Sequence, residues 1–163
     1  MKKNIFLLIA VLCTSPIYTQ NVKLLATYVK PVNGETRFVT VLSDNTIWWA
    51  DPALVQWNKV ATNNLPAKFE IKRFAAYVKP SGDTRYAVVL ADNSIWWADP
   101  ADGNWNNVAA TNLPAKVNLR DFSAYVKSNG ETRFAVVLDN NTMWWADPGQ
   151  GNWNEVSLKT MGH

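Results

Sequence analysis

Chemically reactive side chains are scarce in this sequence. Its 163 residues include one cysteine, Cys13, and one histidine, His163, which ends the chain. A lone cysteine near the N-terminus excludes an internal disulfide and leaves no thiol nucleophile in the body of the protein. With only a terminal histidine, the chain also lacks a Ser-His-Asp triad and a histidine-ligated metal site. We therefore predict no catalytic residue, no metal and no cofactor.

Long apolar runs are absent too, except for a short one at the N-terminus. Two lysines precede an apolar stretch over 5–13, and small polar residues follow it. This order is typical of an export signal, and the stretch is too short to span a bilayer. We predict a signal peptide over 1–20, cleaved between Ser15 and Gln20, and no transmembrane segment. The mature protein is then secreted or extracellular, with the periplasm or surface attachment as alternatives.

Excess charge is small once the signal is removed. The formal net charge of +3 includes Lys2 and Lys3, so the mature chain carries +1. Nucleic-acid binding needs a basic patch or stripe, and we therefore exclude nucleic acid as a partner. A hydrophobic content of 48% and a charged content of 18% are typical of a folded domain.

Tryptophan, by contrast, is abundant and strictly repeated. The motif Trp-Trp-Ala-Asp-Pro begins at Trp48, Trp96 and Trp144, a spacing of 48 residues. A further tryptophan follows each copy at a constant distance, so the copies contain all nine tryptophans. This period indicates supersecondary units that pack on one another. We place residues 21–163 in a single domain of three repeats. The repeats cover about 22–68, 69–116 and 117–163.

Each repeat has the pattern of four short strands. In the first repeat, 24–30 and 36–42 are rich in β-branched and aromatic residues and flank an Asn-Gly turn. Shorter candidate strands follow at 46–50 and 57–60, separated by an Asp-Pro pair that breaks the ladder because proline has no N–H. Helical periodicity extends nowhere beyond one turn. We predict an all-β fold.

Three four-stranded units can form a β-trefoil or three blades of a β-propeller. In the second strand both faces are apolar, with Phe38 and Leu42 on one side and Val39 and Val41 on the other. A strand with two apolar faces is covered on both sides, as in a propeller blade. This favours β-propeller-like blades and keeps the β-trefoil as the alternative.

The order of short motifs in a repeat resembles the blade repeat of tachylectin and tectonin-type lectins. The second repeat carries Phe74, Pro80-Ser81-Gly82, Tyr86-Ala87-Val88, Asp92, Ile95-Trp96, Asp99-Pro100 and Asn104-Trp105. The resemblance implies a β-propeller lectin. Such lectins have five or six blades in one chain, whereas this chain has three, too few for a ring of the usual four to eight. We expect a homodimer that completes a six-bladed ring.

Aromatic and polar residues that recur in every repeat form the candidate binding set. The first tryptophan of each motif shares its strand face with small and polar residues, which favours partial exposure to water, and the face of the second has the pattern of a core. The sequence leaves open which tryptophan of each pair faces water. An indole stacks on the apolar face of a sugar, while arginine, asparagine and aspartate bind its hydroxyls. The predicted carbohydrate-binding residues are Trp48, Trp96, Trp144, Arg37, Arg85, Arg133, Asn58, Asn106, Asn154, Asp51, Asp99 and Asp147.

Structural roles for the same residues stay open. The nine tryptophans can all be packing residues, the arginines and aspartates can form ion pairs, and Asp-Pro is a common turn former. The functional hypothesis is a secreted, multivalent lectin without catalytic activity, because linked weak sites gain avidity on a glycan surface. The alternative is a secreted protein-interaction or assembly module that uses exposed tryptophan faces. A glycan-cleaving enzyme is disfavoured, since glycosidases need two carboxylates in different environments.

Overall fold

The computed structural model describes residues 20–54 and 56–157. Almost all of the predicted signal peptide, together with Cys13 and His163, lies outside these residues. The described residues contain twelve strands and no helix, so the all-β prediction is confirmed. A search of the same residues accordingly finds no apolar helix of membrane-spanning length.

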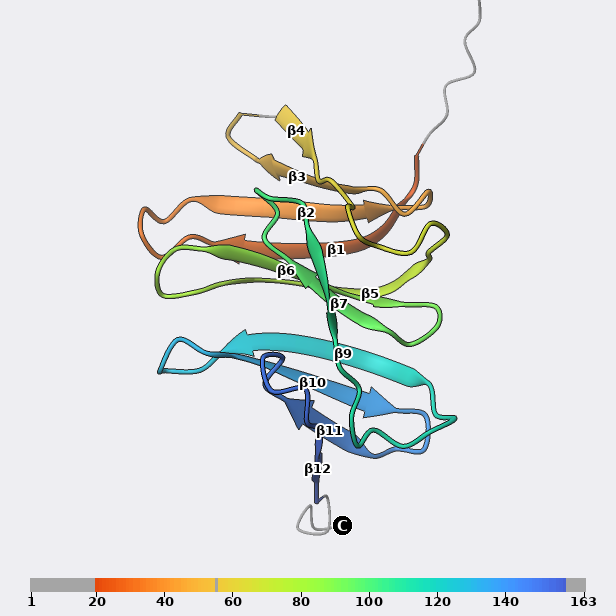
Figure 1. Cartoon of the computed structure of the whole chain (residues 1–163). Coiled ribbons are helices and arrows are strands. Elements are labelled where there is room, and N and C mark those ends of the chain that lie inside the picture. Colours follow the sequence, from red (N-terminus) through yellow and green to blue (C-terminus); the bar gives the residue numbers. More distant parts are fainter. Residues whose placement is uncertain (1–19, 55, 158–163) are drawn as a thin grey trace, which may run out of the picture.

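The strands form three separate antiparallel sheets, each built from four consecutive strands and here called blades 1, 2 and 3 (Figure 1). Blade 1 comprises β1 (Val22–Val29), β2 (Thr36–Leu42), β3 (Ile47–Asp51) and β4 (Gln56–Lys59). Blade 2 comprises β5 (Ile71–Val78), β6 (Thr84–Leu90), β7 (Ile95–Ala98) and β8 (Trp105–Val108). Blade 3 comprises β9 (Leu119–Val126), β10 (Thr132–Leu138), β11 (Met143–Ala146) and β12 (Asn154–Val156). Because the sheets share no strand, the prediction of three blades is confirmed and the β-trefoil is set aside.

The turn between the second and third strands of each blade sets the register of that hairpin. Its asparagine takes the left-handed conformation, with φ of 64°, 66° and 62° at Asn45, Asn93 and Asn141. Asparagine tolerates this conformation because its short side chain bonds locally. In blade 1 the resulting register pairs Val39 with Trp49. Directly paired residues share a sheet face, so Trp49 lies on the side of Val39.

Each blade therefore has two faces, a forward face toward the next blade and a backward face toward the preceding one. In β6, Tyr86 and Val88 point backward into a core shared with blade 1. Ala87 and Val89 of the same strand point forward into a core shared with blade 3. All four side chains are fully buried, as expected for a strand that is covered on both sides.

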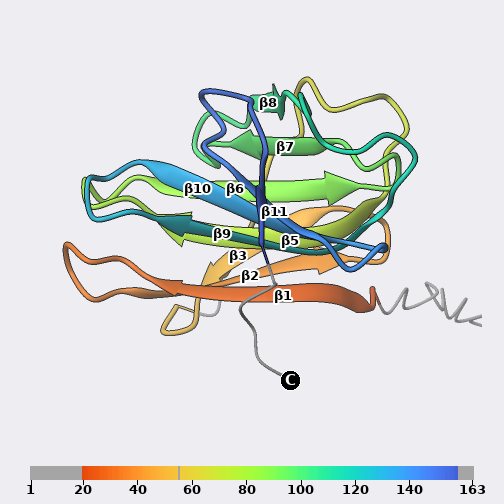
Figure 2. The ribbon, with the colours of Figure 1, turned by 90° about the horizontal axis from the view of Figure 1, so that it is seen from below.

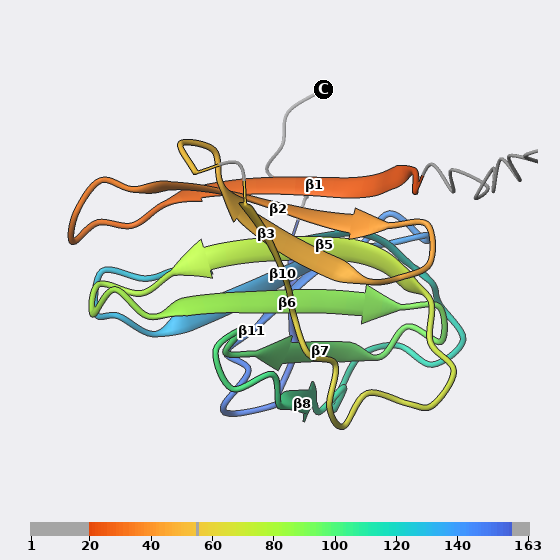
Figure 3. The ribbon, with the colours of Figure 1, turned by 90° about the horizontal axis from the view of Figure 1, so that it is seen from above.

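The blades stack in chain order without closing into a ring. Strand β5 lies against β1 on one side and β9 on the other, whereas β1 and β9 do not contact each other among the described residues. Figures 2 and 3, which view the stack from below and from above, show the long strands of the three sheets running roughly side by side. Among residues 20–54 and 56–157, nothing covers the backward face of blade 1 or the forward face of blade 3.

The two junctions between blades repeat the same aromatic contact. At the junction of blades 1 and 2, Tyr28 meets Tyr86 edge to face with ring centroids 6.3 Å apart. At the junction of blades 2 and 3, Tyr77 meets Phe134 in the same way at 6.2 Å. Edge-to-face pairs at this distance are favourable beyond the area that they bury. The repeat thus encodes the contact between blades as well as the blade itself.

Candidate functional site

Two cavities of similar size lie between consecutive blades. One, here called pocket 1–2, has a volume of about 310 Å³ and lies between blades 1 and 2. The other, pocket 2–3, has a volume of about 290 Å³ and lies between blades 2 and 3. Pocket 1–2 is lined by Tyr28, Lys30, Arg37, Trp49, Gly82, Asp83, Thr84, Tyr86, Asp99, Pro100 and Ala101. Pocket 2–3 is lined by Tyr77, Lys79, Arg85, Trp97, Glu131, Thr132, Asp147, Pro148, Gly149 and Gln150.

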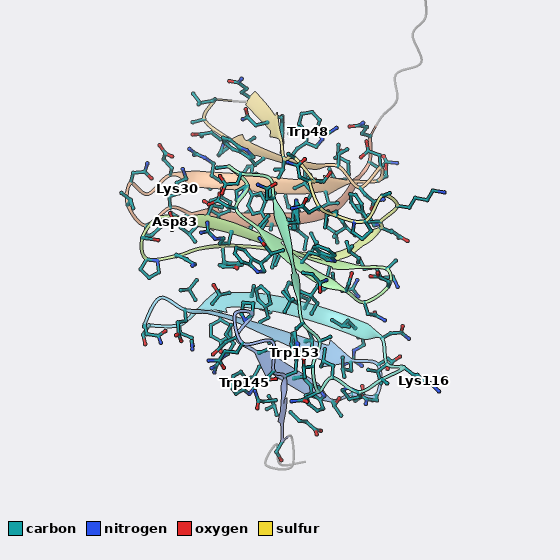
Figure 4. All side chains as sticks on the ribbon, viewed as in Figure 1. Lys30, Trp48, Asp83, Lys116, Trp145 and Trp153 are labelled. Carbon is teal, nitrogen blue, oxygen red and sulfur yellow. The ribbon has the colours of Figure 1, made fainter. Side chains whose placement is uncertain are left out.

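Each pocket is assembled from two halves on different blades. The preceding blade supplies a forward half of tyrosine, lysine, arginine and tryptophan. The following blade supplies a backward half, in which an acid and a threonine of the first hairpin lie near the Asp-Pro pair that follows the third strand. Figure 4 shows one such meeting, with Lys30 of blade 1 and Asp83 of blade 2 near each other on the same side of the stack. A complete pocket therefore requires two adjacent blades.

The arginine of each blade forms an ion pair with the aspartate of the same blade. The shortest N–O distances are 2.8 Å for Arg37–Asp51, 2.6 Å for Arg85–Asp99 and 2.9 Å for Arg133–Asp147. The ion-pair alternative from the sequence is therefore correct, and several of these residues also line the pockets. Within blade 2, Arg85 lines pocket 2–3 while Asp99 lines pocket 1–2. This pair physically connects neighbouring pockets.

Each pocket arginine is also held against a tryptophan. The Cζ atom of Arg37 lies 5.7 Å from the ring centroid of Trp49, and that of Arg85 lies 5.8 Å from that of Trp97. Both distances are within the range of cation–π attraction. Within the described residues, Arg85 Nε is buried without a hydrogen-bond partner. The guanidinium and the indole are thus positioned before any ligand binds, which lowers the entropic cost of binding.

The carboxyl groups of pocket 2–3 are held in their charged form. Hydrogen bonds from Arg133 and, less strongly, Lys127 keep the pKa of Asp147 below its usual range. The hydrogen bond from Lys127 likewise lowers the pKa of Glu131. Both groups accept hydrogen bonds at neutral pH. A glycosidase acid needs the opposite, a raised pKa that keeps its proton available.

Two of the pocket tyrosines, Tyr77 and Tyr86, stay neutral. Burial raises the pKa of Tyr77 above its ordinary value and raises that of Tyr86 strongly. Their hydroxyls can therefore donate as well as accept hydrogen bonds.

The first tryptophan of each motif lies on the backward face of its blade, away from the arginine of that blade. Its indole N–H donates to a hydroxyl two residues earlier at 2.9 Å in all three blades, from Trp48 to Thr46, Trp96 to Ser94 and Trp144 to Thr142. The last two pack against the cores between blades, whereas Trp48 lies on the uncovered face of blade 1 (Figure 4). None of the three lines pocket 1–2 or pocket 2–3.

The other predicted site residues divide into three groups. Arg37, Arg85, Asp99 and Asp147 line the pockets. Arg133 and Asp51 have equivalent positions at the two open ends of the stack. The asparagines lie outside both linings and donate weakly to backbone carbonyls, with distances of 3.5, 3.4 and 3.3 Å for Asn58, Asn106 and Asn154. Sugar binding by any of the twelve predicted residues stays a prediction.

Sequence reasoning missed the second tryptophan of each motif as a pocket residue. Trp49 and Trp97 were expected in the core because Ile47 and Ile95 share their faces. Both are half-buried and pack against the cores that contain Ile47 and Ile95, as expected, and each also lines a pocket. The hairpin register was the available signal, because pairing Val39 with Trp49 also places Arg37 on that face.

Comparison with known proteins supports the fold and leaves the family open. No family model matches the chain, and no curated protein matches it. A fucose lectin from Kordia zhangzhouensis, solved in complex with methyl-fucoside, superposes with a TM-score of 0.53 and 14% identity, covering 82% of this chain and 97% of that one. A GH74 xyloglucanase from Xanthomonas campestris gives 0.51 and 12%, covering 81% of this chain and 21% of the enzyme. At these identities the likeness shows the fold alone, and no match confirms the tachylectin and tectonin family.

Proposed function

We propose that this protein is a lectin that binds sugars in the pockets between its blades. The observation that supports this is the repeated pairing of an Arg-Trp-Tyr half with a Thr-Asp-Pro half across each junction. The indole offers an apolar surface to a sugar ring, while the guanidinium and carboxylate offer a donor and an acceptor to neighbouring hydroxyls. Two pockets per chain make the protein multivalent.

The pocket dimensions suit a small sugar. Volumes of about 310 and 290 Å³ lie at the lower end of the range for small-molecule sites. This size fits a monosaccharide, or one residue of a longer glycan that extends into solvent. Because the structurally similar Kordia lectin was solved with methyl-fucoside, methyl-fucoside is the first ligand to test.

We further propose that the protein binds glycans without cleaving them. The likeness to a xyloglucanase raises the alternative of hydrolysis. In pocket 2–3, however, neighbouring cations lower the pKa of both Glu131 and Asp147. Neither group then holds a proton for a leaving sugar near neutral pH.

Export and assembly complete the proposal. The N-terminal segment acts as a signal peptide, so the working protein is secreted, and two chains form a six-bladed ring. After expression in an exporting host, N-terminal sequencing of the released protein finds a start between Ser15 and Gln20. Material that retains Met1 and stays inside the cell contradicts export.

Calorimetry combined with tryptophan fluorescence tests sugar binding directly. Titration with methyl-fucoside, and with a panel of other methyl glycosides, produces heat and shifts the emission of Trp49 and Trp97, which line the pockets. Arg85→Ala abolishes binding in pocket 2–3 and lowers the number of sugars bound per chain. Lys68→Ala is the control, because this exposed cationic residue lies outside both pockets. If no sugar in the panel changes heat or fluorescence, the lectin proposal fails.

A second candidate is a protein-interaction module, favoured by the exposed apolar side chains on the backward face of blade 1. Leu25 is 66% exposed and Trp57 is 46% exposed on that face, and contiguous apolar surface marks an interaction site. A heterologous partner that binds there, together with an absence of sugar binding, would favour this candidate over the lectin.

A further inference from the structure

We infer that a second copy of this chain covers the two open blade faces and that each contact between copies builds a further sugar pocket from residues of both chains. The inference rests on the proposed function for the nature of the ligand.

The backward face of blade 1 exposes apolar side chains at positions where the other two blades are less exposed. Trp57 is 46% exposed, whereas its counterparts Trp105 and Trp153 are each 2% exposed. Leu25 is 66% exposed, whereas its counterpart Phe122 in blade 3 is 9% exposed. In blades 2 and 3 these positions pack under the forward face of the preceding blade, where Phe74 is half-buried and the other counterparts are buried. The described residues contain no blade that precedes blade 1.

The forward face of blade 3 carries the matching unpaired residue. Tyr125 is 46% exposed, while its counterpart Tyr77 is 7% exposed and packs on Phe134. The position equivalent to Phe134 in blade 1 is Phe38, which is 37% exposed. Tyr125 and Phe38 are therefore the two halves of the aromatic contact that recurs at both internal junctions. They lie at opposite ends of one chain and can meet only between two chains.

A hydrogen bond from an indole crosses both internal junctions, and the equivalent donor and acceptor lie on the two open faces. The indole of Trp105 donates to the carbonyl of Ala61 at 3.0 Å, and that of Trp153 donates to the carbonyl of Ala109 at the same distance. The next pair in this series is Trp57 with the carbonyl of Ser157, an exposed residue directly after β12.

A second series of hydrogen bonds runs from a turn asparagine to the next inner strand. Asn45 Oδ1 accepts from the backbone N–H of Ile71, and Asn93 Oδ1 accepts from that of Leu119, both at 3.1 Å. The corresponding acceptor in blade 3 is Asn141, which takes a hydrogen bond from Arg120 instead. The corresponding donor is the N–H of Val22 at the start of blade 1. Both series therefore match the forward face of blade 3 to the backward face of blade 1.

The open faces also carry the two halves of a sugar pocket. Blade 3 has the forward half, in which the Cζ atom of Arg133 lies 3.7 Å from the ring centroid of Trp145. Blade 1 has the backward half, with Thr36 in the first hairpin and Asp51 before Pro52. These residue types occupy the same repeat positions as in pockets 1–2 and 2–3. Joining blade 3 of one copy to blade 1 of another completes a third pocket of the same kind.

Ring closure sets the number of copies at two. The contact joins different surfaces, so it continues until the ring closes. Two chains supply six blades, which is within the range of four to eight that propellers use, whereas three chains would supply nine. The dimer contains the contact twice and holds six pockets, of which two are shared between the chains.

Size-exclusion chromatography with light scattering tests the contact without any sugar. The purified wild-type chain elutes as a dimer, and Leu25→Glu elutes as a monomer, because a carboxylate at this position would be buried against apolar groups in the ring. Leu25 is already 66% exposed within one chain, so the variant keeps its fold by circular dichroism. Val32→Glu is the matched control, since Val32 is 74% exposed but lies in a hairpin loop beside Gly82, and it stays dimeric.

Calorimetry with methyl-fucoside then counts the pockets. Wild type binds three sugars per chain and Leu25→Glu binds two, because only the shared pocket is lost. A monomeric wild type, an open series of larger species, or a dimer that Leu25→Glu leaves intact overturns the ring. An intact dimer that saturates at two sugars per chain overturns the shared pocket. If no sugar binds at all, the proposed function and the shared sugar pocket both fail, and light scattering still decides the ring.

Discussion

The two tryptophans of each motif are adjacent in the chain and serve opposite sides of a blade. Trp96 bonds to Ser94 and packs on the core between blades 1 and 2, while Trp97 lies beside Arg85 in pocket 2–3. Side chains alternate between the faces of a strand, so one step along β7 separates Trp96, which lines neither pocket, from Trp97, which packs on the next core and also lines pocket 2–3. The arginine works with the tryptophan on its own face.

Substitution separates these two roles. Trp97→Ala removes the stacking surface of pocket 2–3, so the calorimetric number of sugars per chain falls by one. Trp96→Ala leaves that number unchanged and lowers the free energy of unfolding by about 2 kcal/mol, because it removes a half-buried side chain next to a core. The reverse outcome, with the site lost in Trp96→Ala alone, would support the residue predicted from the sequence.

Acid weakens the Arg133–Asp147 ion pair, and its effect on stability has a defined sign. Arg133 lowers the pKa of Asp147 in the folded chain, so the pair stabilises the fold above the unfolded-state pKa of about 4. This stabilisation is lost as the pH falls through the lower folded-state pKa. Urea unfolding at pH 7 and pH 3 therefore shows a larger loss of stability in wild type than in Asp147→Asn. Equal losses in the two proteins would exclude a contribution from this pair.

At the scale of elements, each later blade is joined to the preceding one through a tight approach of two backbones. Gly103 precedes β8 with a φ of +64°, and a Cβ built there would lie 2.5 Å from the Cβ of Ala61 in the preceding linker. Beside this contact, Asn63 and Asn104 form a parallel bridge. The glycine is needed both for its left-handed backbone and for the absence of a side chain.

Replacing each of two glycines by alanine tests whether the close approach at Gly103 requires glycine. Gly103→Ala lowers the free energy of unfolding by about 2 kcal/mol, because it combines a strained backbone with a steric clash. Gly149→Ala changes it by less than about 0.5 kcal/mol, since a Cβ there meets nothing within 4 Å and Ala101 has the same repeat position. Chemical denaturation measures both. Equal effects would show that the close approach adds nothing to stability.

At the scale of the whole molecule, repetition places equivalent pockets along one side of the stack of blades. In each pocket, the following blade contributes its first hairpin and the Asp-Pro pair after its third strand. The preceding blade contributes its tyrosine, lysine, arginine and tryptophan. Sites that face the same way can contact one glycan-bearing surface together. Linked sites of this kind gain affinity without any new contact.

The gain in apparent affinity is measured by varying the density of sugar immobilised on a surface. On a dense methyl-fucoside surface the wild-type protein has an apparent affinity at least about 100-fold higher than for free methyl-fucoside. Leu25→Glu, with fewer linked sites, shows a clearly smaller gain, as measured by surface plasmon resonance. An affinity that does not depend on sugar density would contradict joint binding by several pockets.

Repeat spacing, turn residues and strand patterns predict most of the fold of this protein. The 48-residue spacing of Trp48, Trp96 and Trp144 indicates three units, and the Asn-Gly and Asp-Pro pairs mark where strands end. Two apolar faces on β2 and β6 indicate blades covered on both sides. Arg37 and Asp51 were recognised as repeated polar residues, because charged groups stand out beside strands of this composition.

The pocket required information that no single repeat contains. Whether Trp48 or Trp49 joins Arg37 depends on hairpin register, a pairing between strands. The other half of each pocket comes from the following blade, about one repeat further along the chain.

The sequence by itself therefore determined the repeat, the strands and the residue types available for binding, because these follow from periodicity and short-range turn chemistry. Only the tertiary structure decided which tryptophan meets the arginine, which blades share a pocket and which faces stay uncovered. Those features depend on contacts between residues that are distant in the chain and become neighbours only when the sheets pack.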